Sequence, residues 1–181
     1  MTPSPPDSEL LARAVQGDHE ALNDVMRLHE DRVFSVCLRI MGNREQALDA
    51  TQDTFLTVFR KAHQFKGRSA VGTWIYRIAV NTCYDQIRKA KRRPSQPMPD
   101  YYDPEDELAG DQVEAAAVRP DIRKALQAIP QEFRAAVVLS DMEGMSLPDV
   151  AEVLGVPVGT VKSRVFRGRR LLAELLGNQN Q

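Results

Sequence analysis

Apolar residues recur along this chain at intervals of three and four, the spacing of amphipathic helices, and no convincing alternating run indicates a strand. The pattern predicts helices over 7–17, 18–41 and 44–62, from Gly72 or Thr73 to about Ala90, over 121–129, and after Pro130. In the third of these helices we expect the apolar side chains to face inward, namely Ala47, Leu48, Phe55, Val58 and Phe59. The predicted fold class is therefore all-α.

A helix, a tight turn and a second helix are predicted between residues 146 and 172. Ser146 can cap the first of these helices. Gly155 can adopt the positive φ of a sharp helix end, and Pro157 prevents the helix from continuing. A small residue at Ala151, four positions before Gly155, allows the two helices to cross closely. This combination is typical of a DNA-binding helix-turn-helix.

The second helix of this motif divides into an apolar side and a cationic side. Placed at about 100° per residue, the outward residues are Lys162, Ser163, Phe166, Arg167, Arg169 and Arg170. The sequence pattern puts no acidic residue on this side, and Phe166 is an aromatic ring without apolar neighbours there. Both details favour contact with DNA. The alternative is an ordinary helical hairpin with a solvated basic surface.

The composition argues against several classes of function. No apolar run approaches the roughly 20 residues needed to span a bilayer, and the first residues lack the pattern of a signal peptide. We therefore expect a cytoplasmic protein without membrane insertion. His19, His29 and His63 show no metal-ligand spacing, and neither a nucleophile beside a base nor a glycine-rich phosphate loop is present. The sequence predicts no catalytic residue, no metal and no cofactor.

Charge divides the chain although the net charge is only −1. Residues 60–93 are strongly basic, with Asp85 as their only acid, and residues 100–121 are strongly acidic, with Arg119 as their only base. A polyanion would therefore meet two basic zones separated by an acidic strip. We expect two small helical domains, over 1–92 and 121–177. We expect a flexible acidic linker with prolines over 93–120, and a disordered tail over 178–181.

The predicted fourth helix carries a second candidate nucleic-acid surface. Opposite its apolar side lies a narrow row at spacings of four, three and four, formed by Arg77, Asn81, Tyr84 and Arg88. Arginines can pair phosphates, an amide can hydrogen-bond a base edge, and a tyrosine ring can stack on a base. These groups suit a strand with exposed bases. The alternative is a solvated surface with one incidental tyrosine.

Two further features of the N-terminal half permit more than one interpretation. Asp49 and Asp53 stand one turn apart with Gln52 between them. No histidine or second acidic pair joins them, so a protein-contact surface is favoured over acid–base catalysis or a metal, with a solvated surface as the alternative. Cys37 and Cys83 are far apart in sequence and form no paired motif, which favours buried, reduced thiols over a redox role.

At this point three runs of residues resemble one known family. NREQALDATQDTFLTVFRKA, from Asn43, resembles the core-polymerase-binding helix of bacterial RNA polymerase sigma factors of the extracytoplasmic-function (ECF) type. FKGRSAVGTWIYRIAVNTCYDQIRKAKRR, from Phe65, resembles their promoter-melting region. IPQEFRAAVVLSDMEGMSLPDVAEVLGVPVGTVKSRVFRGRRLL, from Ile129, resembles their domain for the upstream (−35) promoter element. The motifs TWxYRIAxN and GTVKSRxxR are together highly specific, and the three runs occur in the family's order.

The resemblance implies a role for each matching position. Core polymerase would be bound through its clamp coiled coil by Leu48, Asp49, Gln52 and Asp53. The downstream (−10) element would be read at Asn81, supported by Trp74 and flanked by the row of Arg77, Tyr84 and Arg88. The −35 major groove would receive Lys162, Ser163, Phe166 and Arg167, with phosphate contacts from Arg164, Arg169 and Arg170.

The same resemblance implies the partners of the chain. They are core RNA polymerase, at its clamp and flap, promoter DNA, as a −10 single strand and a −35 duplex, and an anti-sigma factor. The acidic linker would pass near the active-site channel and the RNA exit path, and the protein would join the nucleoid when bound to polymerase. The chain departs from the family at Val71 and Gly72, where an aromatic and a larger residue are usual, and it lacks a polar cap at Val158.

Two other classes of protein remain open at the level of sequence. A conventional helix-turn-helix regulator would bind duplex DNA without joining polymerase, but it needs a ligand pocket or a two-fold interface, and the N-terminal half shows neither signal. A protein-binding adaptor would retain its function when the charge of Arg77 or Arg167 is reversed.

Overall fold

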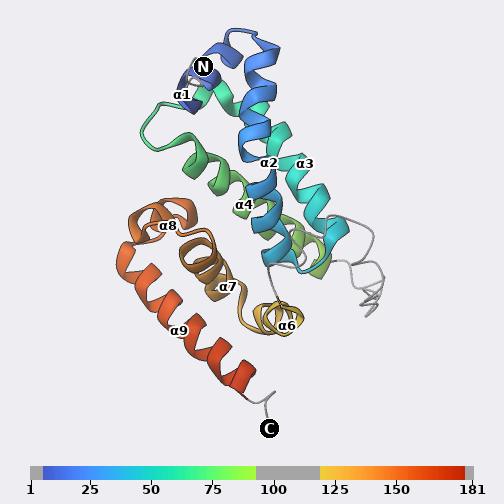
Figure 1. Cartoon of the computed structure of the whole chain (residues 1–181), viewed down its shortest axis with the longest axis vertical. Helices are drawn as coiled ribbons and strands as arrows, with labels where there is room; N and C mark the ends of the chain where they lie inside the picture. Colours follow the sequence, from blue (N-terminus) through green and yellow to red (C-terminus); the bar gives the residue numbers. More distant parts are fainter. Residues whose placement is uncertain (1–5, 93–118, 178–181) are drawn as a thin grey trace.

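The computed structural model describes residues 6–92 and 119–177, and every regular element in these ranges is helical (Figure 1). The N-terminal helices are α1 (Asp7–Val15), α2 (His19–Met41), α3 (Arg44–Lys61), the short 3₁₀ helix η1 (Ala62–Gln64) and α4 (Val71–Arg92). The C-terminal helices are α6 (Pro120–Ala128), α7 (Gln131–Val137), the π-helical turn η3 (Val138–Met142), α8 (Leu147–Leu154) and α9 (Val158–Gly177). The prediction of two all-α modules is confirmed. The expected linker, up to residue 118, and the expected tail lie outside the described residues.

Local sequence signals determine where these helices begin and end. Asp18 and Asn43 cap α2 and α3, accepting hydrogen bonds from the backbone N–H groups of Ala21 (3.1 Å) and Gln46 (2.9 Å). The two predicted ends of α8 are also present, because Ser146 accepts from the N–H of Asp149 at 3.2 Å and Gly155 adopts a φ of 64°. No helix in the described ranges is long and apolar enough to cross a membrane.

The N-terminal core is built where α2, α3 and α4 pack together. Val25, Val36, Val58 and Ile75 are fully buried there. Two threonines of α3 are buried as well, and each satisfies its hydroxyl by donating to the carbonyl one turn earlier, Thr51 to Ala47 at 2.7 Å and Thr54 to Ala50 at 2.6 Å. These threonines complete the inward line of α3.

The expectation that Leu48 and Phe59 face inward is wrong. Leu48 is 43% exposed and Phe59 is 54% exposed. The inward line of α3 runs through Ala47, Phe55 and Val58, and one residue further along a helix lies about 100° around it. Apolar character alone therefore predicted the wrong side of the helix for Leu48 and Phe59, which are exposed to solvent.

The C-terminal helices bury apolar side chains under α9, and these side chains belong to one cluster with the N-terminal core. Val150, Val161 and Val165 are buried between α8 and α9, and α9 also packs closely on α7. Gly168 makes this second contact possible, because a Cβ atom at that position would lie 2.6 Å from Val137 Cγ2 and 3.2 Å from the Phe133 carbonyl oxygen. The expectation that Gly155 is needed for a close crossing is wrong, because a Cβ atom there would meet nothing within 4 Å, and the glycine instead provides the positive φ that ends α8.

Replacing Gly168 with alanine is expected to destabilise the protein, by about 1–3 kcal/mol before the gain in helix propensity, because the added methyl group overlaps Val137 and a backbone carbonyl. Gly159→Ala on the same helix is the matched control, since a Cβ there meets nothing within 4 Å and should leave stability unchanged or slightly higher. Urea unfolding followed by circular dichroism measures both. Equal effects of the two substitutions would contradict the close contact at Gly168.

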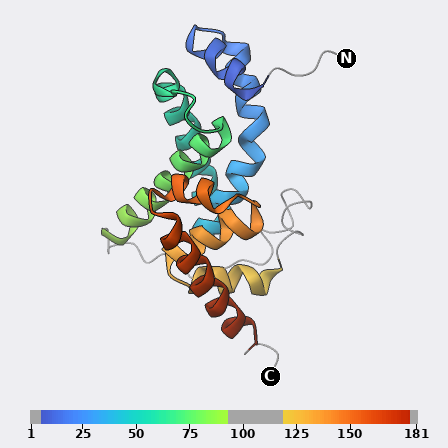
Figure 2. The same cartoon turned by 90° about the vertical axis from the view of Figure 1, so that its left-hand side faces the viewer.

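The two groups of helices pack against each other. In both views α8 lies beside α4, against which it packs, and α6 packs against the end of α2 that leads into α3 (Figures 1 and 2). Nothing in the sequence pattern indicated this contact. It brings the basic α9 module against the helix that carries the other candidate nucleic-acid surface.

Candidate polymerase-binding and nucleic-acid-binding surfaces

The outer side of α3 carries an exposed apolar line bordered by polar groups. Leu48, Leu56 and Phe59 are 43%, 53% and 54% exposed. Gln52 lies between them, and Asp49 and Asp53 are exposed beside the line. The structure thus brings together all four residues predicted to bind polymerase. Leu56 and Phe59 extend the line and were missed as binding residues, although Leu56 follows Gln52 by four residues and Phe59 follows Leu56 by three, and this spacing could have found them. We call these six residues the α3 line, and such a surface is typical of a protein contact.

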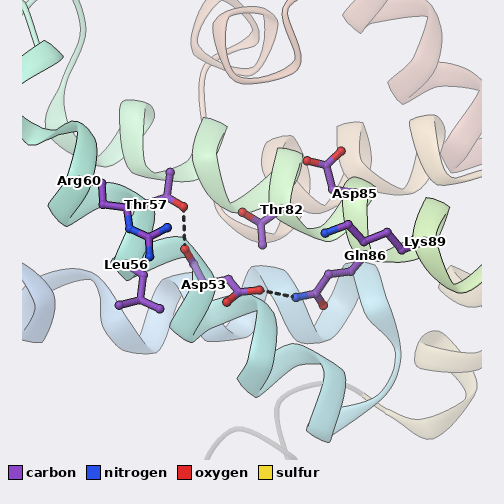
Figure 3. Close-up of a pocket in the computed structure, with 8 residues that line it drawn as sticks. All are labelled: Asp53, Leu56, Thr57, Arg60, Thr82, Asp85, Gln86 and Lys89. Atoms are coloured by element: carbon purple, nitrogen blue, oxygen red, sulfur yellow. Dashed lines mark hydrogen bonds between the residues drawn. The ribbon is translucent and has the colours of Figure 1, made fainter.

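A shallow groove of about 300 Å³ separates the α3 line from α4 (Figure 3). Its lining comes from α3, with Asp53, Leu56, Thr57 and Arg60, and from α4, with Thr82, Asp85, Gln86 and Lys89. Within it, the Gln86 Nε2 group donates to Asp53 Oδ2 at 3.1 Å. A carboxylate of the α3 line is therefore held by the helix that carries the second candidate surface.

Three of the four residues predicted for the outward row of α4 are exposed to solvent. Arg77, Asn81 and Arg88 are exposed, and Arg88 forms an ion pair with Asp85 one turn earlier. Trp74 is partly buried next to this row, with its ring centroid 5.3 Å from that of Phe65 and the planes inclined at 52°. Trp74 thus lies in the first turn of α4, one turn before Arg77, and packs against Phe65 of the chain that leads into this helix.

Tyr84, the fourth member, points toward the C-terminal helices. Its hydroxyl group donates to the Gln131 carbonyl oxygen at 3.5 Å. Burial, opposed by the nearby Arg164 guanidinium, raises the pKa of Tyr84 to about 12. The expectation of four outward residues is therefore wrong at this position, because the row of α4 meets α7 there. In this arrangement the Tyr84 ring is not available for stacking on a base.

Stability should fall at alkaline pH because Tyr76 is buried and Tyr84 is partly buried. Burial raises the pKa of Tyr76, as of Tyr84, to about 12, against about 10 for an exposed phenol. The folded state binds each phenol proton more tightly, so this stabilisation is complete below about pH 10 and is lost as the pH rises toward 12. We expect the free energy of unfolding to decrease over that window and Tyr84→Phe to reduce the decrease. Urea unfolding at a series of pH values measures both, and an unchanged profile in Tyr84→Phe would contradict burial of the phenol.

Gly72, where the family usually has a larger residue, lies beside His29 of α2. A Cβ atom at Gly72 would lie 3.3 Å from His29 Cε1. His29 is itself held by Asp7, with its Nε2 atom 2.7 Å from Asp7 Oδ2. The space that a larger residue would need at position 72 is therefore partly filled by a histidine fixed from α1.

The outward side of α9 is cationic, but two of its arginines form ion pairs with acidic side chains. Lys162, Ser163 and Arg167 are exposed, and Phe166 is the most exposed large apolar side chain of the described residues at 69%. Arg164 is partly buried and lies toward Tyr84.

The expectation that this side has no acidic partner is wrong for two arginines. Arg169 binds Asp141 through Nε at 2.8 Å and Nη2 at 2.6 Å, and these hydrogen bonds lower the pKa of Asp141. Arg170 contacts Glu174 at 3.2 Å. Asp141 belongs to η3, so no pattern along α9 could reveal it. Arg169 is better placed to hold η3 against α9 than to reach for a phosphate.

Cys37 and Cys83 meet inside the N-terminal core. Both are fully buried, and the Cys37 thiol together with burial raises the pKa of Cys83, which keeps that thiol neutral. The placement agrees with structural core thiols. Among the residues that the structure describes, no three histidine, cysteine, aspartate or glutamate side chains gather as a metal site.

Comparison with known proteins places both groups of helices in one family. Residues 25–93 match the family model Sigma-70 region 2, and residues 119–172 match Sigma-70, region 4. The chain is 43% identical over 174 residues to the ECF RNA polymerase sigma factor SigM of Mycobacterium tuberculosis, covering 96% of this chain and 86% of that one. It is 32% identical to the ECF RNA polymerase sigma factor SigW of Bacillus subtilis, covering 89% and 91%.

Solved structures agree with these matches. The sigma factor RpoE of Bartonella quintana, in complex with the anti-sigma factor NepR, aligns with a TM-score of 0.68 at 27% identity over 86% of this chain and 96% of that one. CnrH, in complex with the cytosolic domain of CnrY, aligns with a TM-score of 0.69 at 26% identity over 95% and 97%. With the exposed α3 line, the outward row of α4 and the cationic helix α9 in the family's order, this chain belongs to the ECF sigma factors, the RNA polymerase subunits that direct promoter recognition and the initiation of transcription.

Proposed function

We propose that this sigma factor uses three surfaces in turn. The α3 line binds the clamp coiled coil of core polymerase, with Asp49 and Asp53 supplying charge and Leu48 supplying apolar contact. The row of α4 then captures the −10 strand, with Asn81 reading an extracted base. The outward side of α9 binds the −35 duplex, with Lys162, Ser163, Phe166 and Arg167 in the major groove.

The observation that carries this proposal is the adjacency of the first two surfaces. Asp53 of the α3 line accepts a hydrogen bond from Gln86 of α4, so the protein-contact surface is joined directly to the helix that carries the row. The groove between the two helices is lined on the α4 side by Thr82, Asp85, Gln86 and Lys89, which lie outside the row. An initiation factor needs such adjacency because the strand has to be captured next to polymerase. A regulator that acts on duplex DNA alone has no use for an exposed apolar line beside a single-strand surface.

Because the two modules share promoter recognition, neither module needs to bind DNA with high affinity by itself. Extracting a base costs a few kcal/mol, and a single helix in the major groove gives only part of a promoter's binding energy. Joined in one chain on one polymerase, the two sites act at high effective concentration. We therefore expect promoter binding to depend on core enzyme.

Run-off transcription with core RNA polymerase tests the proposal, using a library of fragments from the source genome with and without the protein. New, discrete start sites that appear only with the protein are the expected result. Binding to duplex DNA without core-dependent start sites would overturn it and leave the conventional regulator. A protein-binding adaptor is indicated if charge reversal at Arg167 leaves the function unchanged.

The remaining partners follow from the relatives. RpoE of Bartonella quintana is bound by an anti-sigma factor in its crystal, and we propose that an anti-sigma factor also controls this chain by covering the α3 line. The acidic segment between the two modules would pass along the polymerase rather than along DNA, because like charges repel. With these partners we expect the protein in the cytoplasm, and at the nucleoid when it is bound to polymerase.

A further inference from the structure

His29 of α2 connects α1 to the start of α4. Its Nε2 atom lies 2.7 Å from Asp7 Oδ2 and donates this hydrogen bond, because an ionised carboxylate can only accept. The same ring approaches Gly72 so closely that a Cβ atom there would lie 3.3 Å from Cε1 and 3.7 Å from Nδ1. Only 12% of the His29 side chain is exposed, so both contacts are largely protected from water.

The hydrogen bond from His29 holds a helix that depends on its neighbours. α1 has nine residues, fewer than the roughly 12–15 at which an isolated helix becomes stable in water. It packs on α2, η1 and α4, with Leu10 and Leu11 buried (Figure 1). Asp7 is the first residue of α1, so the bond to His29 fixes the beginning of the helix.

Residues 65–70 join η1 to α4 without regular secondary structure, and we call them the η1–α4 connection. Phe65 at its start packs on Trp74 in the first turn of α4, which closes the connection on itself. α1 packs on η1 at one end, and His29 packs on Gly72 at the other. The two ends of the connection are therefore held against the rest of the N-terminal helices by α1 and His29.

The η1–α4 connection and the start of α4 carry the cations that precede Asn81 in the chain. Lys66, Arg68 and Arg77 are all exposed. Such cations position a nucleic-acid strand through its phosphates without reading its sequence. Binding groups have to be held within about 0.5 Å of their working geometry by the residues that support them. A shift of the connection would therefore move the phosphate-binding cations relative to the residue proposed to read the base.

We propose that His29, fixed by Asp7, is a positioning residue for the −10 surface, which fills the space beside Gly72 and fixes the η1–α4 connection relative to Asn81. The consequence at the promoter rests on the proposed function, whereas the placement of the connection needs no ligand. His29 acts through the connection, because its small exposed fraction leaves the ring little surface for DNA. Without the ring, the space beside Gly72 is empty and the beginning of α1 loses its hydrogen bond.

The test uses the full chain, in which Trp74 is the single tryptophan. His29→Ala removes both contacts, Asp7→Ala removes only the hydrogen bond, and His29→Gln keeps an amide that can donate to Asp7. The double variant H29A/G72L fills the vacated space from position 72. His19→Ala, at an exposed histidine of α2, is the matched control.

Two sets of measurements separate placement from promoter opening. Circular dichroism shows whether each variant folds. Acrylamide quenching of Trp74 fluorescence and hydrogen–deuterium exchange of residues 65–74 then report the placement of the connection without DNA. Co-purification measures binding to core polymerase, and permanganate reactivity of −10 thymines measures opening, on a promoter fragment obtained from the run-off assay.

We expect His29→Ala to increase the quenching of Trp74 and to accelerate exchange over residues 65–74. Promoter opening should fall about tenfold, since a misplacement of about 1 Å can cost up to about 100-fold. Binding to core polymerase should not change, because the α3 line belongs to another helix. His29→Gln and H29A/G72L should recover most of the placement and of the opening, and His19→Ala should match the unchanged protein.

Unchanged quenching and exchange in a folded His29→Ala variant would overturn the positioning role, as would a loss that H29A/G72L does not recover. Faster exchange with full promoter opening would overturn the link between the connection and the strand. If His29→Ala does not fold, Asp7→Ala decides, because it should change quenching, exchange and opening in the same direction. If the unchanged protein opens no promoter with core polymerase, the proposed function fails instead, and quenching and exchange still decide the placement.

Discussion

Replacing Asp53 with arginine is expected to lower core-dependent transcription about 100-fold without unfolding the protein. Asp53 is exposed on the α3 line, and its described side-chain contact is the single hydrogen bond from Gln86, so the fold loses little. A charge reversal inside a protein interface typically costs about 2–5 kcal/mol, and about 3 kcal/mol corresponds to a factor of 100. Run-off transcription measures the loss, and co-purification with core polymerase shows whether binding is the step affected.

Glu30→Arg is the control for this experiment, because Glu30 is exposed on α2, away from the α3 line. It makes the same change in net charge and should retain transcription within about twofold, as surface substitutions usually do. Equal losses in the two variants would point to a general charge effect. Full activity of Asp53→Arg would remove the α3 line as the polymerase-binding surface.

Replacing Asn81 with alanine is expected to reduce promoter opening by a factor of about 10 to 100. An amide that pairs with an extracted base offsets part of the cost of extraction, and one such bidentate contact contributes about 1–3 kcal/mol. Asn81 is exposed in the middle of the α4 row, so its truncation leaves no cavity. Permanganate reactivity of unpaired thymines at the −10 element measures opening directly, at constant occupancy of polymerase.

Asn23→Ala is the matched control, since Asn23 is an exposed asparagine of α2. It should open promoters normally. The sharper expectation is a loss of discrimination: Asn81→Ala should respond less than the unchanged protein to substitution of one base in the −10 element. Undiminished discrimination at every position of that element would assign base reading to a residue other than Asn81.

Features carried by one helix could be predicted from the sequence. Asp18, Asn43 and Ser146 are caps, and Gly155 has the positive φ that its position after an apolar stripe indicates. The exposure of Asn81 and Arg167 follows in the same way, because it depends only on a period of 3.6 residues. Leu48 and Phe59 are exceptions among the features carried by one helix. Both are apolar but exposed, as expected of a binding surface, so the rule that apolar residues face inward fails for them.

Features that join distant segments could not be predicted. Glu143 contacts Arg39 across 104 residues, and Arg134 reaches the end of α2 across 94. Neither residue differs in sequence from an ordinary surface charge. Tyr84 was misjudged for the same reason, because its position on α4 is outward until α7 packs over it. Gly168 is similar: its role depends on Phe133 and Val137, which lie on another helix.

The placement of the contacts between the two groups of helices bears on how sigma factors can be rebuilt with new specificities. Gln127, Arg134 and Glu143, which contact α2, lie on α6, on α7 and directly after η3, while the exposed residues proposed to meet the −35 duplex lie on α9. Exchanging Lys162, Ser163, Phe166 and Arg167 for those of a relative therefore leaves these contacts untouched. Grafting a whole foreign C-terminal module would instead remove Glu143 and its companions together. Orthogonal regulators for synthetic gene circuits are thus better made by rewriting one side of one helix than by joining halves of different proteins.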